Sequence, residues 1–89
     1  MEKPITVGMV VFSRAGRDKG NFFMVKEIVD DNFVNIVDGD IRKLDRPKLK
    51  KIKHLKKTDD VLDSIAVKLI KGAKVFDAEV FSALRKYNQ

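Results

Sequence analysis

The sequence of 89 residues contains no cysteine, one histidine and no long apolar run. The absence of cysteine excludes disulfides and thiolate metal sites, and it leaves the redox compartment of the protein open. No segment approaches the length of a membrane span, and the first four residues are not followed by the apolar stretch of a signal peptide. We therefore expect a cytoplasmic protein that has no membrane partner.

Charge is abundant and unevenly distributed. The chain is 44% hydrophobic and 36% charged, as is typical of a soluble folded domain, and its length limits it to one domain with a thin core. Residues 42–57, here called the basic segment, contain nine Lys or Arg residues and one acidic residue, Asp45, whereas the other 73 residues contain 10 basic and 12 acidic residues. Such a one-sided charge favours an anionic partner over a merely solvated face.

The first two thirds of the chain have the pattern of short strands. Runs of β-branched and aromatic residues, separated by turn residues, predict strands over residues 7–13, 21–29, 33–37, 41–44 and 50–55. The last strand is ambiguous, because Leu49, Ile52 and Leu55 are three residues apart and would also suit a helix face. Its short length and the preceding Pro47 favour a strand. The pattern predicts a mainly β fold, with five strands forming a small closed or half-closed barrel over residues 1–57.

The pattern changes to helical spacing at Thr58. Thr58 offers an N-cap, and two aspartates follow it in the first turn. Gly72 suits the C-terminal end of this helix, and a second helix is predicted to begin at Asp77. Residues 58–89 are therefore expected to form a two-helix C-terminal appendage, a helical hairpin whose apolar stripes meet each other or the barrel.

One glycine-bracketed turn carries a resemblance to a known family. The stretch Val7-Gly8-Met9-Val10-Val11, followed by Gly16-Arg17-Asp18-Lys19-Gly20-Asn21 and an apolar strand, resembles the KOW motif. That motif is a β-turn-β element of SH3-like barrels in ribosomal proteins and transcription elongation factors. With the downstream run Asp38-Gly39-Asp40-Ile41-Arg42-Lys43-Leu44, residues 6–57 are similar to the KOW-bearing large-subunit ribosomal proteins of archaea and eukaryotes (the fourteen-e type) and to their small bacterial relatives.

The resemblance implies a small SH3-like barrel, RNA binding and a role in translation, with ribosomal RNA of the large subunit as the partner. Only this resemblance favours RNA over DNA as the partner, because the residues themselves do not show whether a 2′-hydroxyl is contacted. Other ribosomal proteins are possible further partners, and we expect a monomer when the protein is free.

The residues themselves predict phosphate contacts of low sequence specificity. Gly16 and Gly20 can adopt positive φ, so that Arg17 and Lys19 project from a tight loop, and Asp18 is expected to bind nearby backbone amides. Lysine predominates among the basic residues, which suits contacts by point charges and a salt-sensitive affinity. The predicted RNA-binding residues are Arg14, Arg17, Lys19, Arg42, Lys43, Arg46, Lys48, Lys50, Lys51, Lys53, His54, Lys56 and Lys57.

Catalytic chemistry finds little support in the sequence. His54 lies among lysines, which disfavour its protonated form and help it little as a base. The acidic groups at residues 30–31 and 38–40 suit turns better than a catalytic carboxylate pair, and no nucleotide-binding fingerprint occurs. We therefore expect no enzyme activity, no catalytic residue, no metal and no cofactor.

Two other functions compete with RNA binding. A protein-interaction module of SH3-like type, in a transcription or translation complex, would use the acidic turns at residues 30–31 and 38–40 as its docking face. A binder of anionic membranes would use the basic segment, but such segments usually belong to an amphipathic helix or lie beside a lipid anchor, and neither is evident.

Overall fold

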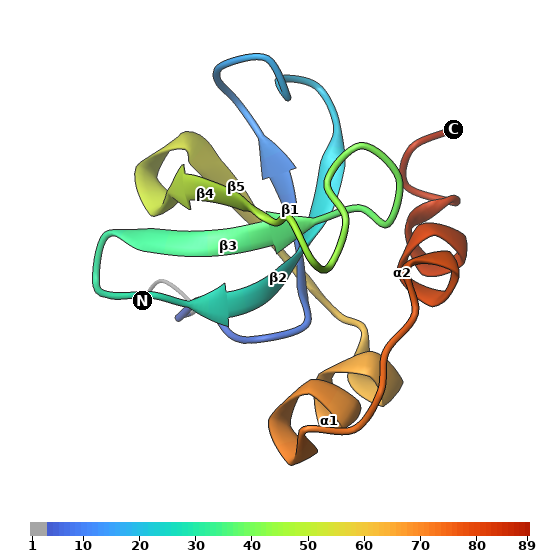
Figure 1. Ribbon diagram of the computed structural model, residues 1–89. Helices are drawn as coiled ribbons and strands as arrows, with labels where there is room; N and C mark the ends of the chain where they lie inside the picture. Colours follow the sequence, from blue (N-terminus) through green and yellow to red (C-terminus); the bar gives the residue numbers. More distant parts are fainter. Residues whose placement is uncertain (1–3) are drawn as a thin grey trace.

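The computed structural model describes residues 4–89 and consists of five strands and two helices (Figure 1). The elements are β1 (Met9–Ser13), β2 (Phe22–Ile28), β3 (Phe33–Val37), β4 (Lys48–Lys51), the 3-10 turn η1 (Ile52–His54), β5 (Leu55–Val61), α1 (Asp63–Lys71) and α2 (Asp77–Leu84). The prediction of a mainly β fold with five strands, followed by two helices, is confirmed.

All five strands belong to one antiparallel sheet, in the order β4-β3-β2-β1-β5. The strands β1 to β4 follow one another as neighbours, whereas β5 returns to pair with β1. The edges of the sheet are therefore β4 and β5, which η1 connects, and within residues 4–89 no strand pairing closes the sheet between them. In Figure 1, β1 runs steeply across β3, so the sheet is strongly coiled.

Both faces of the sheet contribute buried residues to the core, and successive side chains of a strand point to opposite faces. One face forms an inner cluster that consists of strand residues: Met9, Val11, Phe23, Val25, Val34, Ile36 and Leu55. The other face packs against both helices in an outer cluster: Val10, Met24, Val37, Ile65, Val80 and Leu84. The neighbours Phe22 and Phe23 point to opposite faces, with Phe22 packed on the outer cluster and against the ring of Tyr87, which follows α2.

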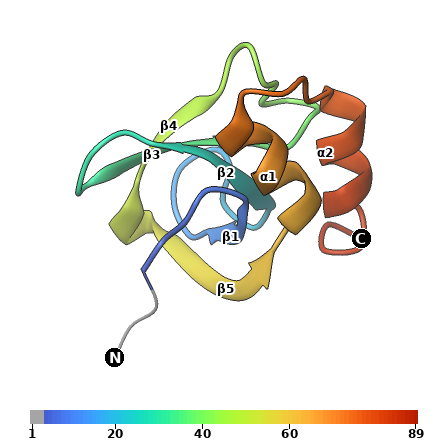
Figure 2. The ribbon, with the colours of Figure 1, turned by 90° about the horizontal axis from the view of Figure 1, so that it is seen from below.

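The helices approach the sheet closely at two glycines. A Cβ atom added to Gly8 would lie 2.5 Å from the Cβ of Ala66 in α1, and one added to Gly39 would lie 2.2 Å from the carbonyl oxygen of Asp77 at the start of α2. Figure 2 shows both helices on one side of the sheet, away from η1. The helices thus share a core with the sheet, and the expected division between residues 57 and 58 falls inside β5.

The predicted strand at residues 41–44 is wrong, because this segment is part of a loop over residues 38–47. The carboxylate of Asp38 accepts the backbone N–H groups of Asp40 at 2.9 Å and Arg42 at 2.8 Å. The N–H of Leu44 donates to the carboxylate of Asp77 at 2.8 Å. Side-chain oxygens therefore occupy alternate N–H groups that a strand would use in its ladder.

The predicted strand at residues 50–55 is interrupted. Its first two residues end β4, its last residue begins β5, and the turn η1 lies between them. Leu49, Ile52 and Leu55 belong to three different elements, β4, η1 and β5, so their spacing of three belongs neither to a single strand nor to one face of a helix.

The predicted start of the first helix at Thr58 is also wrong. Strand β5 extends to Val61, and α1 begins at Asp63 and ends at Lys71. Gly72 follows as its C-cap with a φ of 72°, which fits the predicted C-terminal glycine. The hydroxyl of Thr58 donates to the Val10 carbonyl oxygen at 2.6 Å and accepts the N–H of Asp60 at 3.1 Å. Thus Thr58 forms a cap-like bond, but it does so in an irregular part of β5, where the pairing register with β1 shifts.

Candidate nucleic-acid interface

Three cationic side chains connect the basic segment to the loop between β1 and β2. The Lys50 ammonium in β4 donates to the carbonyl oxygen of Ala15 at 2.6 Å. The guanidinium of Arg42 pairs with both carboxylate oxygens of Asp18, at 3.2 and 3.1 Å. The guanidinium of Arg14 donates to the Lys53 carbonyl oxygen in η1 at 3.2 Å. These contacts bring the β1–β2 loop, the loop at residues 38–47, β4 and η1 together at one end of the sheet.

Two of the predicted RNA-binding residues have internal partners. The side chain of Lys50 is buried, with 7% of its surface exposed, and lies under the β1–β2 loop. Arg42 is half-buried against Asp18, which is itself buried, so the carboxylate of Asp18 binds this guanidinium rather than the expected backbone amides. Both cations hold the loops in place, and they are poorly placed to contact a phosphate directly.

Most of the remaining predicted residues are open to solvent. The exposed cations are Arg14, Arg17, Lys19, Lys43, Arg46, Lys51, Lys53 and Lys56, while Lys48, His54 and Lys57 are half-buried. Strand alternation explains part of this difference. Lys50 pairs with Val34 and shares its inner face, whereas Lys51 pairs with Phe33 and points to the opposite face.

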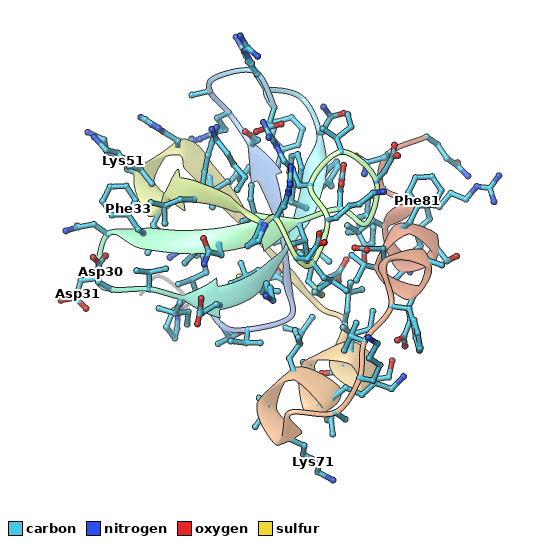
Figure 3. All side chains as sticks on the ribbon, viewed as in Figure 1. Asp30, Asp31, Phe33, Lys51, Lys71 and Phe81 are labelled. Atoms are coloured by element: carbon cyan, nitrogen blue, oxygen red, sulfur yellow. The ribbon has the colours of Figure 1, made fainter. Side chains whose placement is uncertain are left out.

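A groove of about 730 Å³ lies beside η1 and is here called the basic groove. Its lining residues are Arg14, Asp31, Asn32, Phe33, Lys51, Ile52, Lys53, Leu55 and Lys57. Two hydrogen bonds hold η1 on either side of it, from the N–H of Ile52 to the Asn32 carbonyl oxygen at 2.8 Å and from Arg14 to Lys53. Figure 3 shows Phe33 and Lys51 next to each other at this end of the sheet, near Asp30 and Asp31.

Sequence reasoning did not assign Phe33, Asn32 or Ile52 to a binding site. Their proximity to Lys51 and Lys53 depends on the pairing register of β3 with β4 and on the 3-10 turn, and no local pattern in the sequence specifies either. The only local signal was the spacing of three through Ile52, which we interpreted as part of a strand.

Asp30 and the backbone of His54 take part in structural hydrogen bonds. The carboxylate of Asp30 accepts the N–H groups of Asn32 and Phe33, both at 2.8 Å, as expected of a turn. The carbonyl oxygen of His54 accepts the N–H of Arg14 at 2.9 Å. In the part of the chain that the structure describes, no group of three or more His, Cys, Asp or Glu residues is arranged to hold a metal ion.

Two pKa shifts occur on the helical side of the molecule. The hydrogen bond from the ammonium of Lys68 in α1, 2.7 Å long, is the main cause that lowers the pKa of Glu79 in α2. The hydrogen bond from the Tyr87 hydroxyl to the carboxylate of Asp60, also 2.7 Å long, is the main cause that raises the pKa of Tyr87. Neither residue lines the basic groove.

No protein-family model matches the chain. The resemblance to the KOW motif thus rests on the residues quoted above. None of the helices in residues 4–89 has the length and apolar character that crossing a membrane requires.

Proposed function

We propose that this protein is a non-catalytic RNA-binding protein that contacts structured RNA through Lys and Arg contacts to phosphates. The observation that carries the proposal is the convergence of the basic segment and the β1–β2 loop at one end of the sheet, through Lys50, Arg42 and Arg14. Residues 58–89 hold five basic and five acidic residues, so the positive charge is one-sided. A field of this shape attracts a polyanion and orients the protein on approach.

The KOW resemblance supports ribosomal RNA of the large subunit as the partner. We propose a small SH3-like barrel for residues 6–57, and two observations support it. The strands β1 to β4 are sequential neighbours, and β5 returns to β1 after a 3-10 turn. The inner cluster takes its residues from β1, β2, β3 and β5, so the coiled sheet packs on itself.

A second candidate function is a protein-interaction module in a transcription or translation complex. It is favoured by large apolar side chains exposed near α2, where Ile41 is 72% exposed and Phe76 is 60% exposed. These side chains lie on the loop at residues 38–47 and on the helical part, and they do not line the basic groove. A protein contact there is compatible with RNA bound at the basic end.

Co-sedimentation with large ribosomal subunits at moderate salt tests the proposal. One variant replaces the exposed lysines Lys51, Lys53 and Lys56 by Gln, and the control variant replaces Lys71, Lys74 and Lys86, which are also exposed, by Gln. Both lose three positive charges, but only the first loses them from the basic segment. We expect native protein and the control to sediment with the subunits, and the first variant to remain in the supernatant. Equal sedimentation of both variants would contradict the proposal.

A further inference from the structure

The basic groove differs from a plain phosphate-binding surface because part of its wall is apolar. The ring of Phe33 and the side chains of Ile52 and Leu55 line it together with four cationic residues. Phe33 is half-buried, and Lys51 lies directly opposite it across the β3–β4 ladder. An aromatic ring is thus held at a fixed position beside an exposed ammonium.

This combination complements a ligand that is both flat and anionic. A base stacks on an aromatic ring with little dependence on its identity, while the backbone phosphates bind nearby cations. The bases of a paired RNA helix are stacked inside it and cannot enter a groove, so only an unpaired nucleotide can reach the ring. The volume of about 730 Å³ lies within the range of small-ligand sites.

The charges around the groove favour one orientation of a bound nucleotide. Asp31 and Asn32 lie where η1 meets the β2–β3 turn, through the bond from Ile52 to Asn32. Arg14 and Lys53 lie where η1 meets the β1–β2 loop. A phosphate is repelled by the carboxylate of Asp31 and attracted to the other side, so the sugar-phosphate chain should follow Arg14 and Lys53 toward the β1–β2 loop.

We infer that the basic groove receives one unpaired nucleotide of the bound RNA, with its base against Phe33 and its phosphates at Lys53 and Arg14. This inference rests on the proposed function and deepens it, because it names a bulge or loop nucleotide in a structured RNA as the feature recognised. Phosphate contacts by Arg17 and Lys19 on the β1–β2 loop would then hold the adjacent paired region.

The test compares a fully paired RNA hairpin with the same hairpin carrying one bulged 2-aminopurine. We expect native protein to bind the bulged hairpin about 5- to 150-fold more tightly, the range that base–aromatic stacking supports, and to raise the 2-aminopurine fluorescence as the base leaves its stack with the neighbouring RNA bases. Phe33→Leu should lose most of this preference and of the fluorescence increase. The matched control is Phe81→Leu, which makes the same change at an exposed ring on α2. In Figure 3 this ring lies far from Phe33, so the control should keep both the preference for the bulged hairpin and the fluorescence change.

The outcomes separate the inference from the proposed function. If no hairpin binds, both fail. If both hairpins bind equally to native protein and to Phe33→Leu, RNA binding stands and the inference is overturned. Should Phe33→Leu not fold, native protein crosslinked to a bulged 4-thiouridine decides the question. A crosslink to the segments around Phe33 or Lys51 to Lys57 supports the inference, and one confined to Arg17–Gly20 overturns it.

Discussion

The ammonium group of Lys50 lies 2.6 Å from the carbonyl oxygen of Ala15, so that a buried lysine of β4 supports the β1–β2 loop from below. A Cβ atom added to Gly16 would lie only 3.1 Å from this ammonium, so the loop and the lysine fit closely. The neighbouring Lys51 is exposed on the other face of the strand. These two adjacent lysines of the basic segment therefore have different roles. Lys50 stabilises the loop, and Lys51 places a positive charge at the surface.

Replacing each of these lysines by Met should separate the two tasks. Lys50→Met removes a charged donor and leaves the carbonyl oxygen of Ala15 with only the Ser13 hydroxyl, 3.2 Å away, as its partner, so we expect the free energy of unfolding to fall by about 1–3 kcal/mol. Lys51→Met changes an exposed side chain and should alter the free energy of unfolding by no more than about 0.5 kcal/mol. Urea denaturation measures both variants. Equal stability of the two would show that the buried contact contributes nothing.

The pair between Asp18 and Arg42 should couple the β1–β2 loop to the loop at residues 38–47. Both carboxylate oxygens of Asp18 are bound, and 8% of its side chain and 25% of that of Arg42 are exposed, so solvent screening is limited. We expect a double-mutant cycle of Asp18→Asn and Arg42→Gln to give a coupling energy of about 0.5–3 kcal/mol. Additive effects of the two substitutions, measured by urea denaturation, would show that the loops are independent.

Gly39→Ala should destabilise the protein more than Gly20→Ala does. Both glycines have positive φ, 79° and 92°, so both substitutions incur the left-handed backbone cost of about 1–2 kcal/mol. At Gly39 the new methyl group would also meet the carbonyl oxygen of Asp77 and the backbone N of Phe81, whereas nothing lies within 4 Å at Gly20. Overpacking adds about 1–3 kcal/mol. Thermal unfolding of the two variants measures the difference, and its absence would mean that α2 is not docked on this loop.

The parts of the fold that the sequence predicted are those decided by local residue patterns. The first three strands follow from β-branched runs that are bounded by turn residues, and the end of α1 follows from Gly72. The opposite directions of Phe22 and Phe23 follow from alternation alone. In the candidate site, the list of cations came from charge counting, which cannot show that Lys50 is buried or that Arg42 binds a carboxylate.

The errors occurred where a distant partner decided the local conformation. Leu44 has a β-forming neighbourhood, but its N–H binds Asp77, which lies 33 residues away in the chain. Thr58 has the sequence of an N-cap, but its hydroxyl binds Val10 in β1, 48 residues away. Local propensity is a weak prior that such tertiary contacts override. The basic groove was missed for the same reason, since Phe33 and Lys51 meet only through the strand register.

The contact between Lys68 and Glu79 should make stability depend on pH in acid. Because the hydrogen bond from Lys68 lowers the pKa of Glu79 below 4.5, its stabilising effect is present above pH 4.5 and is lost as the pH falls through the lower folded-state pKa. We expect Glu79→Gln to be less stable than native protein near neutral pH and to approach its stability as the pH falls below 4.5. The stability of Lys68→Met should depend on pH in the same way as that of Glu79→Gln, because this substitution removes the hydrogen bond that is the main cause of the lowered pKa of Glu79. Urea midpoints measured from pH 6 to pH 3 test this, and a stability difference that stays constant over that range would contradict it.

The salt dependence of RNA binding should locate the phosphate contacts. If about six cations neutralise phosphates, the logarithm of affinity should fall against the logarithm of salt concentration with a slope of magnitude about 4–5. Replacing Lys51, Lys53 and Lys56 by Gln should flatten this slope by about two to three and weaken binding to all structured RNAs alike, because phosphate contacts carry no sequence information.

Two further variants make this test specific to the proposed surface. Replacing Arg17 and Lys19 by Gln should flatten the slope by up to about two, since the β1–β2 loop is joined to the basic segment through Lys50 and Arg42. Replacing Lys71, Lys74 and Lys86, exposed on the helical side, should leave the slope unchanged although the net charge falls equally. Flattening of the slope in proportion to the number of charges that each set removes, whatever their position, would mean that the RNA senses only the total charge. In that case the convergence of the basic segment and the β1–β2 loop at one end of the sheet would have no role in binding.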